Sequence, residues 1–275
     1  MIISSNLFLM LNNSIDNLVK SKYNNIKEII MKNKMKDILN DMIAHTSKLG
    51  FLNIVRVTGT EEKTSFDSVS ELKEVIMFAE TSEPYQEMLG VFGMPQLEKL
   101  NYLLSCNEYR EDAVISITND AQNKPTGIHF ENKDGDFKND YKFMNSDIIN
   151  QKLKQFKFRG AKWDVEITPG LNSIQRFHAQ AGANTEYTSF LVKSDGNNLK
   201  FTFGDMNSHG GEFVFATNVT GKLTSSWPLP VSIVSSILKA ADVNNTVMSF
   251  SNDGLLEITL DSGLAVYKYF IPAVT

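Results

Sequence analysis

One unit, a strand followed by a helix and three further strands, recurs along this chain of 275 residues. A repeated supersecondary unit constrains the fold more than any single segment does, because each copy buries its apolar face against its neighbours. The clearest copy ends the chain. Its helix follows Pro230, and the expected core face consists of Val231, Val234, Ile237, Leu238 and Ala241. Its strands are expected at residues 222–227, 246–251, 255–260 and 264–271.

Residues 163–219 hold a second clear copy of the unit. A strand at 163–167 leads to a helix behind Pro169, a residue suited to a helix start. Asp195-Gly196 in this copy and Asp253-Gly254 in the last one occupy the same hairpin position, and Asp-Gly favours tight turns. The helix is expected to turn Leu171, Ile174, His178 and Ala181 toward the core, with His178 hydrogen-bonded there. Strands are expected at 188–193, 199–204 and 211–219.

The first half of the chain repeats the unit more faintly. One copy has a strand at 89–94, a helix behind Pro95 that buries Leu97, Leu100 and Leu104, and strands at 113–118, 126–131 and 140–144. The earliest copy has a helix at 35–48 that buries Ile38, Leu39, Met42 and Ile43, and strands at 51–57, 64–69 and 74–79. The first and third helices are separated by nearly the same interval as the second and fourth. Four modules are therefore predicted to pair into two domains of similar length.

The repeat places the first domain at 35–148, an interdomain connector at 149–161 and the second domain at 162–275. The connector also has alternating residues around Lys152–Phe158, which would allow an edge strand there. Residues 1–34 lie outside the repeat and are expected to be an N-terminal extension that is not native to the domain, with Met31 or Met35 as the alternative start.

Composition excludes several classes of protein. Hydrophobic residues make up 42% of the chain, which is enough for a sizeable core. The formal net charge of −5 excludes a surface that is basic throughout, but it leaves room for one basic face. The single cysteine, Cys106, excludes an intramolecular disulfide framework. No apolar run reaches the length of a membrane-spanning helix, and the N-terminus lacks the pattern of a secretory signal, so we expect a cytoplasmic protein with no membrane partner.

Two domains of doubled β-α-β-β-β topology resemble a DNA sliding clamp, the processivity factor of a polymerase. The segment FGMPQLEKLNYLLS (92–105) is similar to the second-module strand and helix of T4-type phage clamps. The segment GLLEITLDSGLAVYKYFIPAVT (254–275) resembles the closing hairpin and apolar, proline-containing tail of clamps. The resemblance implies an α+β DNA-clamp fold, like that of proliferating cell nuclear antigen, in which helices line a ring and sheets lie outside.

The resemblance also implies a function. Such a chain would form a ring, here a homotrimer with a dimer as the other possibility, that encircles duplex DNA regardless of sequence. It would tether the replicative DNA polymerase of a phage and would be loaded by a separate ATP-dependent clamp loader. A role in late transcription is a further implication of the phage type.

Cations on the helix faces opposite the apolar stripes would then contact DNA phosphates rather than base edges. The predicted DNA-binding residues are Lys36, Lys48, Lys99, Arg176 and Lys239. A lysine opposite an apolar stripe is also common on any solvated helix, and Asp37, Asp41 and Glu98 are expected on the same faces. The densest basic run comprises Lys152, Lys154, Lys157, Arg159 and Lys162. This run is interpreted as a solvated linker, with contact to DNA or a partner as the alternative.

Family members also hold short partner peptides in an apolar groove beneath the connector and beside the C-terminal tail. By resemblance, this groove would be formed by Leu153, Phe156, Phe158, Phe270, Ile271 and Pro272. The same residue types are ordinary in cores and strand ends, so the sequence alone does not separate these two uses.

Signals of catalysis are missing from the sequence. The four histidines are far apart in the chain, and the segment GTEEKTS (59–65) lacks the second glycine of a phosphate-binding loop. No catalytic residue, metal or cofactor is expected. Two other hypotheses remain: a phage structural or assembly β-protein without a DNA function, and an enzyme whose site a single sequence does not show.

Overall fold

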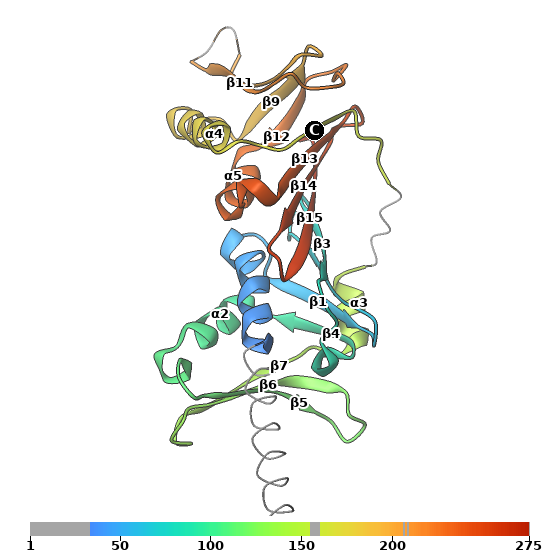
Figure 1. Cartoon of the computed structure of the whole chain (residues 1–275), viewed down its shortest axis with the longest axis vertical. Helices are drawn as coiled ribbons and strands as arrows, with labels where there is room; N and C mark the ends of the chain where they lie inside the picture. Colours follow the sequence, from blue (N-terminus) through green and yellow to red (C-terminus); the bar gives the residue numbers. More distant parts are fainter. Residues whose placement is uncertain (1–33, 155–159, 206, 208, 275) are drawn as a thin grey trace, which may run out of the picture.

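The computed structural model describes residues 34–154, 160–205, 207 and 209–274. The expected extension, apart from Lys34, therefore lies outside the described residues, as do Phe156, Lys157, Phe158 and Arg159. The described chain is elongated, with sheets following one another along its long axis and most helices on one side of them (Figure 1).

The first two modules are present, with short 3-10 turns between their elements. A helix at residues 34–44 and the turn η1 (Ser47–Leu49) precede β1 (Ile54–Gly59), β2 (Thr64–Val69) and β3 (Ile76–Thr81). After η2 (Gln86–Met88), the second module comprises β4 (Gly90–Pro95), α2 (Leu97–Ser105), η3 (Asn107–Tyr109), β5 (Val114–Asn119), β6 (Pro125–Glu131) and β7 (Lys138–Lys142).

The helix α3 (Ser146–Lys152) follows, and then the last two modules. The third module comprises β8 (Val165–Ile167), α4 (Leu171–Ala183), β9 (Ser189–Ser194), β10 (Asn198–Phe203) and β11 (Gly211–Thr217). The fourth comprises β12 (Trp227–Pro230), α5 (Val231–Ala240), η4 (Val243–Asn245), β13 (Thr246–Ser251), β14 (Leu255–Asp261) and β15 (Ala265–Pro272). The predicted repeat of strand, helix and three strands is confirmed in modules two to four.

The leading strands of modules two, three and four each pair with a strand of the other module in their pair. β4 leads into the helix of module two but pairs with β1 of module one, and β8 of module three pairs with β13 of module four. In the same way β12 pairs with β9. Because each leading strand is hydrogen-bonded into the sheet of the other module, the two modules of a pair form one folding unit.

The last strands of modules one and four join the two halves of the chain. β3 and β15 pair antiparallel, with Met77 opposite Tyr269 and Ala79 opposite Tyr267. This pairing produces an eight-stranded sheet of order β4-β1-β2-β3-β15-β14-β13-β8. The other two sheets have the orders β11-β10-β9-β12 and β5-β6-β7.

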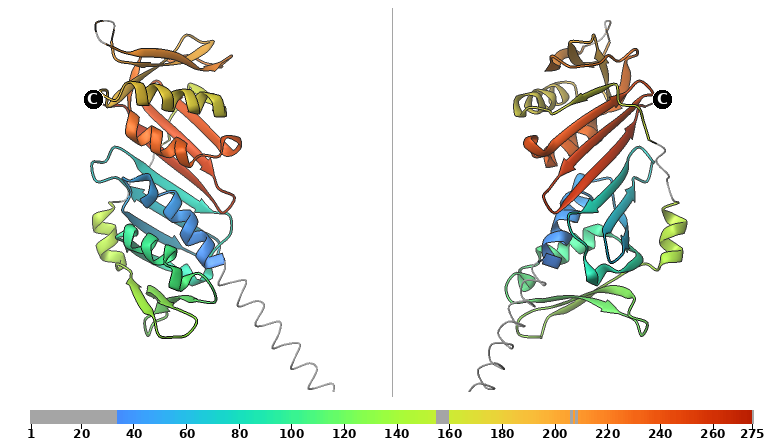
Figure 2. Two further views of the ribbon diagram at one scale, coloured as in Figure 1. Left: turned by 90° about the vertical axis from the view of Figure 1, so that its left-hand side faces the viewer. Right: turned by 45° about the vertical axis from the view of Figure 1, so that its right-hand side comes forward.

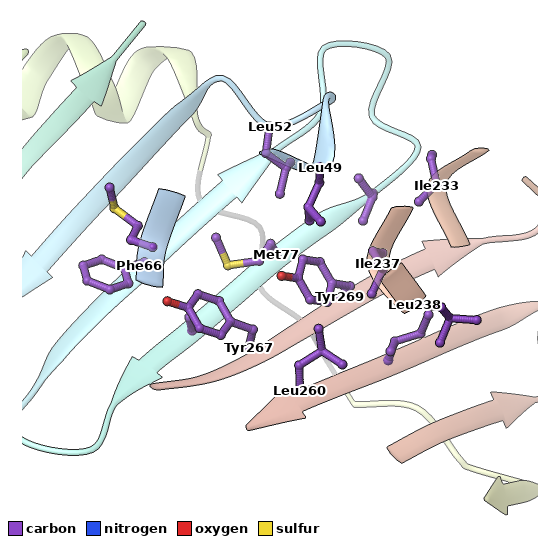
Figure 3. Close-up of a cluster of buried hydrophobic side chains, with 14 of the residues drawn as sticks. Leu49, Leu52, Phe66, Met77, Ile233, Ile237, Leu238, Leu260, Tyr267 and Tyr269 are labelled. Atoms are coloured by element: carbon purple, nitrogen blue, oxygen red, sulfur yellow. The ribbon is translucent and has the colours of Figure 1, made fainter. Parts of the chain in front are cut away.

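The apolar core runs across this junction without a break. Leu49 and Leu52 from module one and Ile233 and Ile237 from α5 lie over the same sheet (Figure 3). All four side chains are buried, and burial of one such aliphatic side chain stabilises the fold by about 1.5–3 kcal/mol. The predicted core faces of the first helix (residues 34–44) and α2 are confirmed by their buried side chains. On α5, Val234, Ile237 and Leu238 are buried as predicted, whereas Val231 and Ala241 are only half-buried and the buried Ile233 was not predicted.

A polar cluster also joins the first helix to β15. The Asp41 carboxylate accepts hydrogen bonds from the hydroxyls of Tyr267 (2.7 Å) and Ser262 (2.9 Å). The His45 ring stacks on Tyr267 with centroids 4.2 Å apart, and the Tyr269 hydroxyl donates to the carbonyl of His45 (2.8 Å). Asp41 was expected on a solvated helix face; its side chain is instead 12% exposed, because these tyrosines come from the distant C-terminal strand.

The helix α3 packs on the outer face of the sheet, opposite the other helices. Arg56 on β1 donates to the Asp67 carboxylate and to the carbonyl of Leu153, just after α3 (3.2 Å). A Cβ at Gly93 would lie 2.8 Å from Ile149, so only a glycine lets α3 lie this close to β4. The boundary expected at 148/149 therefore falls inside a helix that packs on the first domain.

Three other segments differ from the prediction. The first helix ends at residue 44, because the chain tightens into η1 and turns at Gly50 with a φ of 91°. The strand expected at 222–227 begins only at Trp227, because Asn252 bonds to Thr224 and to the carbonyl of Lys222 and so replaces a strand ladder. Of the alternating residues, Lys152 ends α3, and 153–154 form no edge strand.

Candidate functional site

The helices of all four modules lie on one face of the chain and the sheets on the other (Figure 2). Along each strand, every second side chain points toward the helices and the others point to the outer face. On β9, for example, Phe190 and Val192 are buried under the helices, whereas Leu191 and Lys193 are exposed on the outer face. The predicted DNA-binding cations belong to the helix layer.

Two of these five cations are engaged within the protein. The ammonium of Lys36 donates to the carbonyls of Tyr109 (3.0 Å) and Arg110 (3.4 Å). The guanidinium of Arg176 lies over the Phe213 ring, 5.2 Å from its centroid, and donates to the Val214 carbonyl (3.3 Å). Lys36 therefore caps carbonyls near η3, and Arg176 packs on β11. These contacts leave both residues less free to reach a ligand than the sequence pattern indicates.

The other three cations are exposed. Lys48 lies on η1 rather than on the first helix, Lys99 lies on α2, and Lys239 lies near the end of α5. The two halves differ in their negative charges. The first helix and α2 carry Asp37 and Glu98 beside their lysines, whereas α4 and α5 contain no acidic residue. The most uniformly basic part of the helix layer is therefore in the second domain.

His178 is not the core histidine that the sequence predicts. Phe177 takes the core position on α4 and packs on Phe190, Phe201 and Phe203. His178 is half-buried between α4 and α5, with its Nδ1 atom 3.0 Å from the Ser235 hydroxyl. The expected face was shifted by one residue because Leu171, which anchored that pattern, is 59% exposed at the start of the helix.

A second candidate site lies on the outer face, between α3 and the sheet. A hollow of about 490 Å³ is lined by Phe51, Ile54, Val69 and Leu153 among its apolar residues. Ser70, Glu71 and Lys73, from the turn between β2 and β3, also line it, and Leu72 in that turn is 77% exposed. An exposed leucine beside an apolar hollow is typical of a surface that binds a partner.

A row of apolar side chains leads from Val69, at the hollow, to the C-terminal strand. Val69 is paired with Ile76 across β2 and β3, and Ile76 is paired with Phe270 across β3 and β15. Cross-strand partners lie on the same face of a sheet, so these three side chains form one apolar row. The Phe270 ring also meets Phe78 edge-on, with centroids 5.9 Å apart.

The structure places four of the six predicted groove residues. Leu153 lines the hollow, Phe270 lies at the end of the apolar row, and Pro272 is exposed beyond it. Ile271 faces the other way and is fully buried in the core, so it offers no surface to a peptide. Phe156 and Phe158 lie outside the described residues. Sequence reasoning missed Val69 and Ile76, because only the strand pairing brings them beside Phe270.

Of the basic run at 152–162, Lys152 and Lys154 line the same hollow. Lys162 forms an ion pair with Asp164 (3.3 Å). Among the described residues, no three histidine, cysteine or acidic side chains lie close enough together to hold a metal ion. No helix in the described part of the chain is long and apolar enough to cross a membrane.

Comparisons with known proteins show the fold class. No protein-family model matches the sequence, and no curated protein matches it. Solved structures do match, and the protein has the DNA-clamp fold of proliferating cell nuclear antigen (PCNA). One match is PCNA from Thermococcus kodakaraensis, with a TM-score of 0.63 at 11% identity over 86% of this chain and 97% of that one. Another is PCNA from A. fulgidus bound to the C-terminal region of FEN-1, with a TM-score of 0.62 at 10% identity over 89% and 96%.

The predicted fold class, an α+β clamp fold of repeated β-α-β-β-β modules, is thus confirmed. At these identities the similarity establishes the fold and leaves function to be argued from the site.

Proposed function

We propose that this protein is a sliding clamp of the T4-like phage type, a non-enzymatic homotrimeric ring that encircles duplex DNA and tethers the replicative polymerase. The observation that carries the proposal is the arrangement of the elements. Helices from all four modules lie on one face and sheets on the other, and one sheet lies toward each end of the long axis of the described residues (Figures 1 and 2).

The repeat itself indicates how the ring closes. Within the chain, the last strands of modules one and four, β3 and β15, pair antiparallel and join the two halves. The corresponding last strands of modules two and three are β7 and β11, and among the described residues each pairs on one side only. Pairing of β7 with β11 of the next copy would repeat the internal junction. Such a head-to-tail contact closes into a ring when the rotation fits.

Closure would place the helix layer around the hole. The exposed Lys48, Lys99 and Lys239 would then face the DNA backbone. Only these three of the four predicted lysines are exposed on the helix layer of a chain whose net charge is −5, and so few phosphate contacts favour loose, sequence-independent binding over tight binding at one site. We propose the outer hollow and the row Val69–Ile76–Phe270 as the groove for a partner peptide, with the DNA polymerase and an ATP-dependent clamp loader as partners.

The remaining parts of the proposal follow from the family. The proposal includes a domain at 35–148, a connector at 149–161 and a domain at 162–275; the start of this connector belongs to α3 (Ser146–Lys152), which packs on the first domain. The protein acts in the cytoplasm of the host cell. A role in late transcription would use the same groove. A structural or assembly β-protein is the alternative, and it requires neither the helix-layer cations nor DNA.

Linear and circular DNA distinguish a sliding clamp from a structural protein in an experiment that needs no clamp loader. A ring at high concentration threads onto linear duplex DNA through its ends, whereas a covalently closed circle of the same sequence offers no entry. We expect crosslinking of the protein to the linear duplex and not to the closed circle. Equal crosslinking to both, or to neither, would contradict the proposal.

Charge variants test the surface used. Alanine at Lys48, Lys99 and Lys239 together is expected to weaken crosslinking to the linear duplex. Alanine at Lys193, Lys200 and Lys268, which lie on outer sheet faces, serves as the matched control and is expected to change little. The structural alternative predicts no effect of either set.

A further inference from the structure

A hollow of about 550 Å³ lies in the helix layer between α4 and α5. Its polar lining comprises His178, Thr185, Tyr187, Thr188, Ser232, Ser235, Ser236 and Lys239, and Ala181, Gly182 and Val231 contribute little bulk. The two helices run beside each other on the face opposite the sheets (Figure 2). The hollow therefore opens on the side where the proposed function places DNA.

The chemistry of this hollow is that of an anion site. Its lining contains hydroxyl donors, an imidazole and an ammonium, and no acidic side chain. A phosphate group accepts hydrogen bonds and favours cationic donors, whereas a cation would find no carboxylate here. The helices that form the hollow, α4 and α5, also carry no acidic residue, so nothing within them opposes a bound phosphate.

His178 on α4 and Lys239 on α5 both line the hollow. Burial, and then the positive charge of Lys239, lower the pKa of the His178 imidazole below its ordinary value. The neutral ring lies against the Ser235 hydroxyl (3.0 Å). The other titratable group in the lining is the Tyr187 phenol, whose hydroxyl donates to the carbonyl of His209. A phosphate between His178 and Lys239 would offset the repulsion between the two cations and favour a protonated ring.

We propose that this hollow seats a backbone phosphate of duplex DNA, held by Lys239, His178 and the hydroxyls of Ser232, Ser235 and Ser236. The proposal rests on the proposed clamp function and adds a specific contact to it: the ring meets DNA through one phosphate seat per chain in the second domain, in addition to scattered surface lysines. Because the seat includes a histidine, this contact strengthens as the pH falls.

The test follows the histidine rings of the full-length protein by NMR during a pH titration, with and without a short synthetic duplex. We expect the duplex to raise the pKa of His178 by about one, because an anion close to the ring favours its charged form. His129 is the internal control. It lies on the outer sheet face between Asp140 (2.8 Å) and Glu131 (3.2 Å), so its titration should not respond to DNA.

Two variants sharpen the result. Lys239→Ala is expected to reduce the slope of log affinity against log salt by about 0.9 for each seat that holds a phosphate, hence by about 2.7 when all three seats of the ring are occupied. Ser235→Ala removes the neighbour of His178 and is expected to weaken the response of His178 to DNA while leaving the salt slope unchanged. Lys193→Ala, on the outer face of β9, should leave both readouts as in the wild type.

Each other outcome overturns the proposal in a distinguishable way. If inorganic phosphate at matched ionic strength shifts His178 as much as the duplex does, the hollow binds an adventitious ion only. If the duplex perturbs residues around Lys48 or Lys99 but not His178, the seat is refuted and the clamp function stands. If the duplex perturbs no part of the helix layer, the clamp function fails as well.

Discussion

Two tyrosines on one strand allow the junction between the halves of the chain to be tested with a matched pair of variants. Tyr267 and Tyr269 point from β15 to the same face, and both are fully buried. The Tyr267 hydroxyl donates to the Asp41 carboxylate (2.7 Å), whereas the Tyr269 hydroxyl donates to the neutral carbonyl of His45 (2.8 Å). Tyr→Phe at either position removes one hydroxyl and leaves the packing of the ring.

The expected costs differ because the acceptors differ in charge. A hydrogen bond to a charged group contributes about 1.5–3 kcal/mol, and one between neutral groups about 0.5–1.5 kcal/mol. Tyr267→Phe should therefore lower the free energy of unfolding by about 1 kcal/mol more than Tyr269→Phe does at neutral pH. Urea unfolding at one protomer concentration measures both values.

The pH dependence separates the two variants further. Burial opposes ionisation of Asp41, but hydrogen bonds from His45, Tyr267 and Ser262, together with the charge of His45, outweigh burial and lower the pKa of the carboxyl. The stabilisation is therefore present above the unfolded pKa of about 4 and is lost as the pH falls through the folded pKa. In acid, the loss of unfolding free energy caused by Tyr267→Phe should therefore shrink, whereas the loss caused by Tyr269→Phe should stay constant. Equal costs at neutral pH, or a Tyr267→Phe cost that does not change in acid, would refute this account of the junction.

Three further variants test other contacts. Arg56→Ala removes the guanidinium that joins Asp67 to the carbonyl of Leu153. We expect the free energy of unfolding to fall by about 1.5–3 kcal/mol and trypsin to cleave faster after Lys152 and Lys154. Cleavage at the wild-type rate would show that α3 is held by other contacts. Gly93→Ala places a Cβ 2.8 Å from the Ile149 side chain and should lower the free energy of unfolding by about 1–3 kcal/mol, measured by urea unfolding; a variant as stable as the wild type argues against crowding at this site. Val214→Pro on β11 removes a backbone donor from the proposed ring contact, so light scattering should show monomers while the far-ultraviolet circular dichroism spectrum stays unchanged. The control variant Val214→Thr should keep the ring. An intact ring in the proline variant would place the contact on another strand.

The sequence predicts local structure well where one helix face or one turn decides it. The predicted apolar positions of the first helix and α2, and three of the five on α5, are buried, and Gly196 and Gly254 have the positive φ that their hairpin turns require. The sequence also contained an unused signal for α3, since Asn145 caps that helix by accepting a hydrogen bond from the amide of Ile148. Short polar helices of this kind are marginal alone, and α3 depends on the contact of Ile149 with Gly93.

Long-range contacts decide what the sequence could not predict. The partners of Lys36 are the carbonyls of Tyr109 and Arg110, and the partner of Asp41 is Tyr267, all far away in the chain. No local pattern reveals these pairs, so the sequence predicts Lys36 as a DNA-binding cation and places Asp41 on the same helix face. The candidate groove has the same origin, because Val69, Ile76 and Phe270 become neighbours only through strand pairing.

The mass of the assembly in solution tests the central claim most directly. Light scattering across a range of protein concentrations and at two salt concentrations should show a species of about 93 kDa, three times the 30.9 kDa of one chain, as a closed trimeric ring requires. A species of about 62 kDa would refute the trimer and indicate a ring closed by two chains. A chain that remains at about 31 kDa at the highest concentration would show that the outer edges of β7 and β11 do not pair between copies, and would contradict the ring itself.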